Sequence, residues 1–269
     1  MDRMPYVAGQ FYPGDAVTMM TEVKGYLNQA SARETAPTIL AMAPHAGYMF
    51  SGAVCGHTLG RANLAKNILL LGPKHSPLGE RLAVWPSGNW KVPGCSVPVN
   101  ESLAAAILAS DSRLMADTAS HLEEHSLEVI LPFLAALDPE VTIVPVAMWE
   151  RNASVLVEIG ANLGRAVADF PEPVSIVVSS DMNHMLPDKV TRKLDGLAIA
   201  AALTLDPATL FRTVAENRIS MCGVMPMTAG LAAARVLGAT RAELVEYATS
   251  GDVTGEHTQV VGYAGILVS

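Results

Sequence analysis

The chain has 269 residues, half of them hydrophobic and only 16% charged, which is typical of a globular protein and excludes an intrinsically disordered one. A net charge of −8 without a basic tract argues against nucleic acid or an anionic membrane as the main partner, and no apolar segment approaches the roughly 20 residues that span a bilayer. Neither a secretory signal nor a disulfide framework follows from the N-terminus and the three cysteines, so we expect a cytoplasmic protein.

The first half of the chain alternates amphipathic segments with short, continuous apolar runs. In chain order these patterns predict a turn-rich arm over residues 1–14 that packs on the body, a helix over 16–29 with Asp15 as its N-cap, a strand over 38–43, a helix over 51–63, a strand over 67–72, and helices over 101–110 and 126–137. Between residues 81 and 99, Trp, Pro and Gly break the chain into pieces typical of hairpins or an edge excursion. Pro132 is tolerable only if its helix starts close before it.

The second half continues the alternation to the end of the sequence. It predicts, in order, a strand over 141–147, a helix over 153–168, a strand over 174–179, helices over 189–203, 207–217 and 222–237, a strand over 242–249, a loop at 251–255 and a strand over 260–268. Strands alternating with helices favour an α/β fold: a single layered domain over residues 1–269 with a mostly parallel central sheet flanked by helices. We expect the broken stretch 81–99 and the last two strands to add antiparallel edges.

Two of the predicted strands deliver a histidine just beyond a proline. His45 follows the run over 38–43, and His75 follows the run over 67–72. A single histidine near Gly or Pro usually only caps a loop, but two in equivalent places favour a functional pair. Because ligands collect at the carboxyl ends of parallel strands, and imidazole is the commonest metal ligand, the pattern predicts a metal site at this edge of the sheet.

The segment that follows the strand over 174–179 adds two polar residues to the same edge. Asp181 either orients a ligand histidine by accepting its second ring proton or only caps the next helix. His184 is either a third ligand or a general acid/base poised near neutral pH. The sequence leaves both pairs of roles open.

Cys222 stands where the helix over 222–237 begins. A helix N-terminus lowers the pKa of a thiol and makes a thiolate available for metal binding or nucleophilic work. Most lone cysteines are instead small buried hydrophobic residues, and we interpret Cys55 and Cys95 in that way.

The segment from His121 to His125 matches the H-x-x-E-H pattern of inverted zinc peptidases. If the segment is helical, both histidines lie on one face with Glu124 as the base, which makes a zinc hydrolase an alternative hypothesis. Five residues of common types are a weak signal. In a milder version His125 alone reaches the main pocket and His121 stays outside it.

Several segments match one family in one order along nearly the whole chain. They are Val-Ala-Gly-Gln-Phe-Tyr-Pro at 7–13, Ala-Pro-His-Ala-Gly-Tyr at 43–48, Gly-Pro-Lys-His at 72–75, Glu-His-Ser-Leu-Glu at 124–128, Leu-Pro-Phe at 131–133, Ser-Ser-Asp-Met-Asn-His at 179–184 and Cys-Gly at 222–223. Taken together, they resemble the Memo family in its prokaryotic form, AmmeMemoRadiSam system protein B. The Memo fold is similar to that of class III extradiol ring-cleaving dioxygenases, which are non-haem Fe(II) enzymes, and this implies a layered α/β domain with a central pocket.

The resemblance implies a ligand set. His45 and His75 match metal ligands, and Cys222 takes the third place, where the dioxygenases use a carboxylate. Fe(II) is the expected metal, with Cu or Zn as alternatives, because a thiolate is a softer ligand than a carboxylate. Ring cleavage is not inherited with the fold, since chemistry depends on the site.

The resemblance also implies roles for the other pocket residues. His184 and His125 would move protons and Asp181 would orient the site, in a dioxygenase-like redox enzyme acting on an unknown substrate. The family name implies AMMECR-type and radical-SAM proteins as partners. A non-catalytic metal-binding adaptor protein is the main alternative, because some Memo proteins are described as signalling adaptors, and the zinc hydrolase is the second.

Overall fold

Four almost wholly buried strands form the centre of a mixed sheet in the computed structural model, which describes residues 1–269. They are, in spatial order, β1 (Leu40–Ala43), β8 (Val174–Ser179), β2 (Asn67–Pro73) and β7 (Thr142–Met148). Every neighbouring pair among them is parallel. Their continuous apolar runs follow from this position, because both faces of the central strands are covered.

Antiparallel strands extend the sheet at both edges, as predicted. Beside β1 lie β11 (Val260–Val268), then β10 (Ala242–Thr249), with β9 (His184–Leu186) pairing elsewhere along β11; beside β7 lie β3 (Leu82–Val84) and then β6 (Met115–Ala116). β3 runs antiparallel to β7, and β6 runs parallel to β3. β4 (Asn89–Val92) and β5 (Cys95–Pro98) form a separate hairpin. The structure is therefore a single α/β domain with a mostly parallel core and antiparallel edges.

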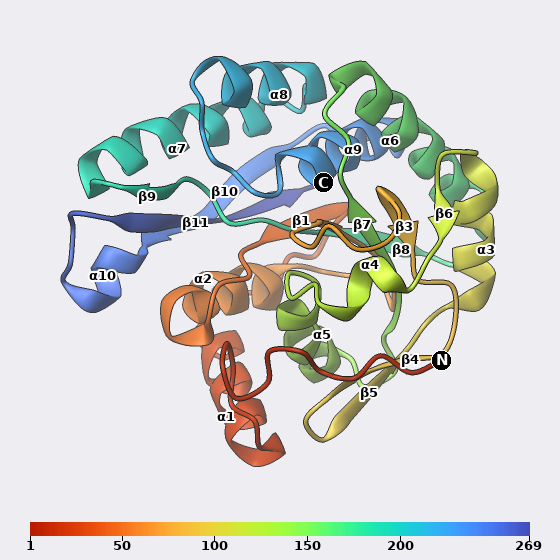
Figure 1. The fold of residues 1–269 in the computed structure, drawn as a ribbon, viewed down its shortest axis with the longest axis horizontal. Coiled ribbons are helices and arrows are strands. Elements are labelled where there is room, and N and C mark those ends of the chain that lie inside the picture. The colour runs from red at the N-terminus through yellow and green to blue at the C-terminus, as the bar shows by residue number, and fades with distance from the viewer.

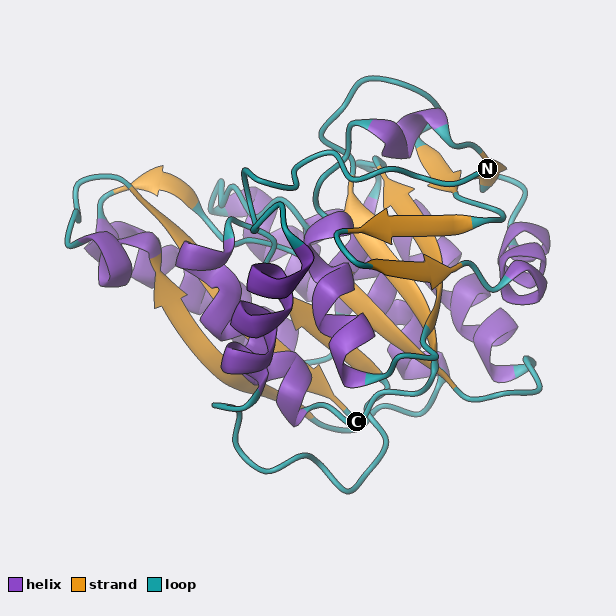
Figure 2. Cartoon of the chain, turned by 90° about the horizontal axis from the view of Figure 1, so that it is seen from below, coloured by secondary structure: helices purple, strands orange, loops and turns teal.

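Helices cover both faces of this sheet (Figures 1 and 2). One face carries α6 (Ala153–Ala168), α7 (Asp188–Leu203), α8 (Pro207–Glu216) and α9 (Val224–Val236), and the other carries α1 (Ala16–Leu27), α2 (Tyr48–Arg61) and α5 (Leu131–Leu137). The remaining helical segments are α3 (Glu101–Ser110), which packs against α6, and the short α4 (Ala119–Leu122), η1 (Glu128–Ile130) and α10 (Ser250–Thr254). None of the helices combines the length and the apolar character that crossing a membrane requires.

The helix predictions hold closely, with two informative differences. The predicted helix over 126–137 divides into η1 and α5, with Pro132 in the first turn of α5, where its missing N–H leaves no helical bond unmade. The predicted loop at 251–255 is instead the short helix α10, because Thr249 and Asp252 form a capping box at its start. Asp15 caps α1 as expected, accepting from the Thr18 amide at 2.9 Å.

The N-terminal arm packs on the body through one buried ion pair. Arg3 and Glu128 have no exposed side-chain surface, and Arg3 Nη1 lies 2.7 Å from Glu128 Oε2. The same carboxylate accepts from the Val7 amide at 3.0 Å and from the Tyr12 hydroxyl at 2.6 Å. The arm is thus fastened to the turn that follows His125.

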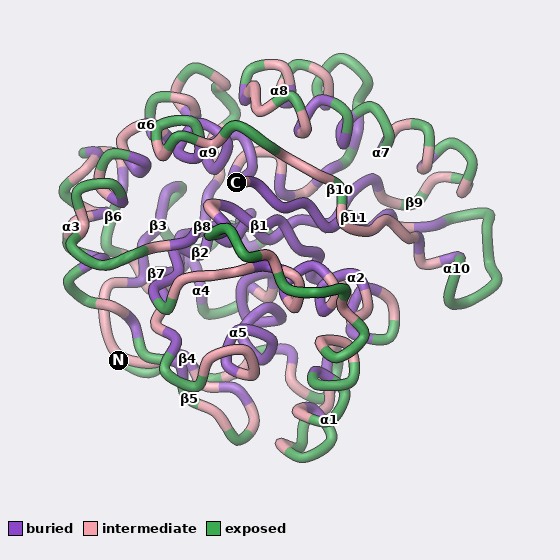
Figure 3. Tube along the Cα trace, turned by 180° about the vertical axis from the view of Figure 1, so that it is seen from behind, coloured by how far each residue is buried: buried purple, intermediate pink, exposed green.

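Figure 3 shows how buried positions concentrate in the strands, while exposed positions gather on loops and outer helix faces.

Candidate functional site

Three neighbouring parallel strands end at one place on the sheet. The sheet order puts β8 between β1 and β2, so their carboxyl ends lie side by side. His45 lies two residues beyond β1, His75 two residues beyond β2, and Asp181 two residues beyond β8. The parallel topology therefore gathers side chains that are far apart in the sequence.

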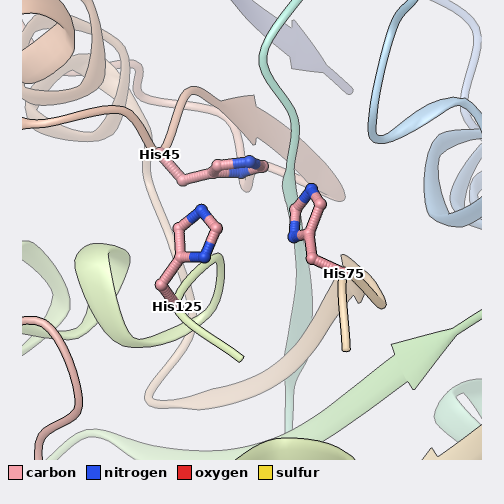
Figure 4. A group of neighbouring side chains, drawn as sticks. All are labelled: His45, His75 and His125. Carbon is pink, nitrogen blue, oxygen red and sulfur yellow. The ribbon is translucent and has the colours of Figure 1, made fainter. Parts of the chain in front are cut away.

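The imidazoles of His45, His75 and His125 converge at this edge, each from a different segment (Figure 4). One ring nitrogen from each residue lies within 4.8 Å of the other two. The ring centroids are 5.6 Å apart for His45 and His75, 5.5 Å for His45 and His125, and 4.9 Å for His75 and His125. His45 is buried, whereas the side chain of His75 is 37% exposed, so the cluster is open to solvent on one side.

A serine hydroxyl determines the ring orientation of His45. Ser179 Oγ lies 2.7 Å from His45 Nδ1 and donates its only proton to the carbonyl of Ser126 at 2.7 Å. The hydroxyl therefore accepts from Nδ1–H, which leaves the lone pair of Nε2 free. The sequence pattern offered Asp181 for this position, but Asp181 Oδ1 instead accepts from the backbone amide of His45 at 2.7 Å.

A buried carboxylate holds His75 in the same way. Glu124 has no exposed surface, and it accepts from the backbone amide of His75 at 2.5 Å and from ring Nδ1 at 2.9 Å. It also accepts from the amide of Ser126 at 2.9 Å. A carboxylate bound to the second nitrogen of a histidine is the usual support of a metal ligand, because it fixes the ring and raises its basicity.

Cys222 approaches the cluster through His45. Its Sγ lies 3.4 Å from His45 Nε2 and accepts from the backbone amide of Asp181 at 3.1 Å. The predicted lowering of its pKa is wrong: burial, reinforced by the nearby Asp181 carboxylate, raises the pKa of the thiol well above its ordinary value. Cys222 precedes the N-cap of α9, Gly223, and hydrogen bonds with the Asp181 amide and Ser180 act to lower its pKa, but burial outweighs them.

Burial also sets the protonation of the histidines. It lowers the pKa of His45 to about 3, with a further contribution from His75, and it lowers the pKa of His125 to about 4, with a contribution from His45. Burial acts in the same direction on His75, but the hydrogen bond and charge of Glu124 outweigh it and raise that pKa. Two of the three imidazoles are therefore neutral over most of the pH range, and neutral imidazole is the form that binds metals.

His184 lies beside the cluster rather than in it. Its Nδ1 lies 3.1 Å from the carbonyl of Ser220, which can only accept, so Nδ1 carries a proton and Nε2 is left free. Its backbone amide donates to Ser220 Oγ at 2.8 Å, and that hydroxyl lies 3.1 Å from Asn183 Oδ1. These bonds hold the ring in one orientation.

A cavity of about 340 Å³ borders the histidine cluster. Its walls combine polar side chains with aromatic and small ones: Gln10, Phe11, Ala46, Gly47, Phe50, His125, Asp181, His184, Val261 and Tyr263. The N-terminal arm, the start of α2, the end of β8 and one face of β11 thus meet around a space large enough for a small molecule.

His121 lies outside this cavity, and the zinc-hydrolase interpretation is wrong. The segment 121–125 is not a helix, because α4 ends one residue after His121. His121 is wholly buried between Trp85 and Trp90, with Nε2 3.1 Å from the carbonyl of Ala83. Burial lowers its pKa to about 4, so it is a neutral core residue.

The donor set at the strand ends fits a transition-metal ion. Imidazole nitrogen and cysteine sulfur are ligands of Fe, Cu and Zn. With bond lengths of about 2.1 Å to nitrogen and 2.3 Å to sulfur, two ligands of one tetrahedral ion lie about 3.6 Å apart. The distance between His45 Nε2 and Cys222 Sγ is 3.4 Å. The grouping of three imidazoles, however, includes His125 and not Cys222.

Sequence reasoning missed the partners of the metal-binding candidates. Ser179 and Glu124 hold the rings of His45 and His75, yet the sequence pattern singles out Ser179 only as the end of a strand and Glu124 only as the base of a hydrolase. Ser179 is the last residue of β8 and is paired with Ala43 of β1. Correct pairing of the two predicted strands is the one signal that would place Ser179 near His45.

Comparison with known proteins gives consistent matches over the whole chain. The family model described as "Memo-like protein" matches residues 3–267. A MEMO1 family protein of Methanopyrus kandleri is 36% identical over 279 residues, covering 99% of both chains. One of Methanosarcina barkeri is 36% identical over 268 residues, covering 99% of both, and one of Thermotoga petrophila is 34% identical over 283 residues, covering 100% of both.

A solved structure is similar to this chain in fold at low sequence identity. An uncharacterized protein from Escherichia coli K12 superposes with a TM-score of 0.62 at 11% identity, covering 86% of this chain and 99% of that one. At this identity the likeness concerns the fold alone.

Proposed function

The chain belongs to the Memo family, and from that premise we propose that it is a metal-dependent redox enzyme with a dioxygenase-like pocket, in which His45, His75 and Cys222 bind one Fe(II) ion. The observation that carries the proposal is the approach of three imidazoles to within 4.8 Å of one another, next to the Cys222 thiol. Cu or Zn would suit the same donors.

Two of the proposed ligands can present Nε2 to a metal, and His45, whose pKa burial lowers to about 3, is already neutral. Ser179 and Glu124 occupy Nδ1 of His45 and His75, so that Nε2 of each ring carries the lone pair when the ring is neutral; for His75, whose pKa Glu124 raises, this requires loss of a proton. Cys222 must lose a proton whose pKa burial raises, so metal affinity should increase with pH. Iron held by three protein ligands supplies open coordination positions and one-electron chemistry.

The remaining polar residues of the cavity are placed for binding and proton transfer. His184 has a free Nε2 that can accept a proton from a ligand in the cavity. Asp181 holds the backbone of His45 and keeps the ring in place. His125 is either a second proton carrier or a competing third ligand, because its ring belongs to the imidazole cluster.

Metal analysis of variants tests this assignment. Protein purified without oxygen should contain about one iron per chain, as expected for one site with three ligands. Cys222→Ser should remove most of this iron if the thiolate is the third ligand, whereas a loss confined to His125→Ala would assign that place to the imidazole. His121→Phe is the control, since His121 lies between two tryptophans and away from the cluster. Iron content unchanged in His45→Ala would refute the metal site.

We also propose AMMECR-type and radical-SAM proteins as partners, because the chain belongs to the Memo family. Co-purification of tagged protein with each candidate tests this. His45→Ala separates an enzyme from a non-catalytic adaptor. Both should lose their metal, but an enzyme also loses turnover, whereas an adaptor still binds its partner.

A further inference from the structure

One buried tyrosine faces the cavity beside the histidine cluster without a hydrogen-bond partner. Tyr263 is only 2% exposed, and it belongs to the wall of the 340 Å³ cavity. Its hydroxyl donates to no group of the protein, yet it is not among the buried polar atoms sealed from solvent. The small part of Tyr263 that remains accessible therefore includes the hydroxyl, and the cavity is the space that this residue lines.

The other buried or half-buried tyrosines behave differently. Each donates its hydroxyl proton to an acceptor of the chain: Tyr12 to Glu128, Tyr26 to the carbonyl of Tyr48, Tyr48 to the carbonyl of Val129 and Tyr247 to Asp195. Buried tyrosine hydroxyls usually find such a partner, because an unpaired donor in a protein interior costs free energy. Tyr263 is the exception, and its missing partner is expected in the cavity.

The strand β11 explains how this phenol is held in place. Successive residues of a strand point to opposite faces, so Val261 and Tyr263 both line the cavity. Gly262 between them packs on the other side against Asp195, where an added Cβ would lie 1.8 Å from Oδ2. β11 is paired with β10, where Ala248 is opposite Tyr263, and this register fixes the direction of the phenol.

The rest of the wall indicates what kind of molecule fits. Phe11, Phe50 and Val261 supply apolar surface. We propose that Tyr263 donates a hydrogen bond to an oxygen acceptor of a small, largely apolar ligand that occupies this cavity. The inference deepens the proposed function, on which it rests for taking the cavity as the place of the substrate.

The phenol is suited to act as a donor. Burial raises its pKa above the ordinary tyrosine value, and the charge of Asp181 acts in the same direction, so the hydroxyl keeps its proton at any physiological pH. Tyr263 is therefore assigned as a residue that contacts the ligand and sets its orientation relative to the imidazole cluster.

Two probes of one shape test the assignment. Acetophenone carries a carbonyl oxygen where α-methylstyrene carries a methylene group, so the pair differs in a single acceptor. Their dissociation constants are measured by ligand-observed NMR on the wild-type protein, on Tyr263→Phe and on Tyr247→Phe. The last variant is the matched control, because its phenol donates to Asp195 and is absent from the cavity wall.

We expect Tyr263→Phe to raise the dissociation constant of acetophenone about 3- to 10-fold, the equivalent of one neutral hydrogen bond. The dissociation constant of α-methylstyrene should stay within about 2-fold of its wild-type value. Tyr247→Phe should change neither constant. An equal loss for both probes, no loss for either, or no binding of acetophenone to the wild-type protein would overturn the inference. Iron content is measured on the same samples: iron-free wild-type protein with the probe difference intact would refute the proposed function alone.

Discussion

Replacing Glu124 with glutamine preserves the shape of the side chain but removes the charge that holds His75. Glu124 is buried without exposed surface, and its two oxygens receive three N–H donors, at 2.5 Å and 2.9 Å from His75 and at 2.9 Å from Ser126. A glutamine side chain keeps one oxygen, so its NH₂ group must face at least one of these donors. Either the ring or the backbone amide of His75 then loses its acceptor.

The size of the effect follows from these contacts. A hydrogen bond to a charged group contributes about 1.5–3 kcal/mol, and an unsatisfied buried donor costs a similar amount. Loss of the group that supports a ligand histidine typically lowers metal affinity about 10- to 100-fold, which corresponds to about 1.4–2.7 kcal/mol. We therefore expect Glu124→Gln to bind metal about 10- to 100-fold more weakly.

The assay is a competition titration of Zn²⁺, chosen as a redox-inert probe ion, against a chromophoric chelator. Glu123→Gln is the control, because it makes the same chemical change one residue away, at an exposed side chain. Circular dichroism checks that both variants are folded. Equal affinities in Glu124→Gln and in the wild-type protein would refute the argument that this carboxylate prepares His75 as a ligand.

Two further predictions concern buried ionisable side chains outside the cluster of His45, His75 and His125. Burial raises the pKa of Asp195 to about 6 despite the hydrogen bond from Tyr247, so the native state keeps a proton that the unfolded state loses near pH 4. The resulting contribution to the free energy of unfolding is fully present below about pH 4, and about 3 kcal/mol of it should be lost as the pH rises through 6. Urea unfolding of Asp195→Asn as a function of pH should not show this decline. The same decline in the variant and in the wild-type protein would contradict the prediction. Glu128→Ala leaves the Arg3 guanidinium buried without a counter-charge, and the free energy of unfolding should fall by about 3–5 kcal/mol. A loss below about 1 kcal/mol in chemical denaturation would show that Arg3 finds another partner or reaches solvent.

Local patterns in the sequence were sufficient for most of the secondary structure. The helices over 101–110 and 153–168 and the strands over 174–179, 242–249 and 260–268 have the predicted bounds. Such segments are long or strongly apolar, so that neighbours in the chain largely decide their conformation. The sequence does not predict the short strands β6 and β9, because two or three residues are too few to show an alternating pattern. Only pairing with β3 and β11 makes these segments strands.

The sequence by itself also determined which histidines stand at strand ends, because His45 and His75 each follow a buried run and a proline. Only the tertiary structure decided what surrounds them. It put β8 between β1 and β2, brought the ring of His125 into the cluster, and supplied Glu124 as a partner that lies 49 residues from His75. It also reversed the expected pKa shift of Cys222. Desolvation and hydrogen bonding depend on groups that are near in space and distant along the chain, and no local pattern records them.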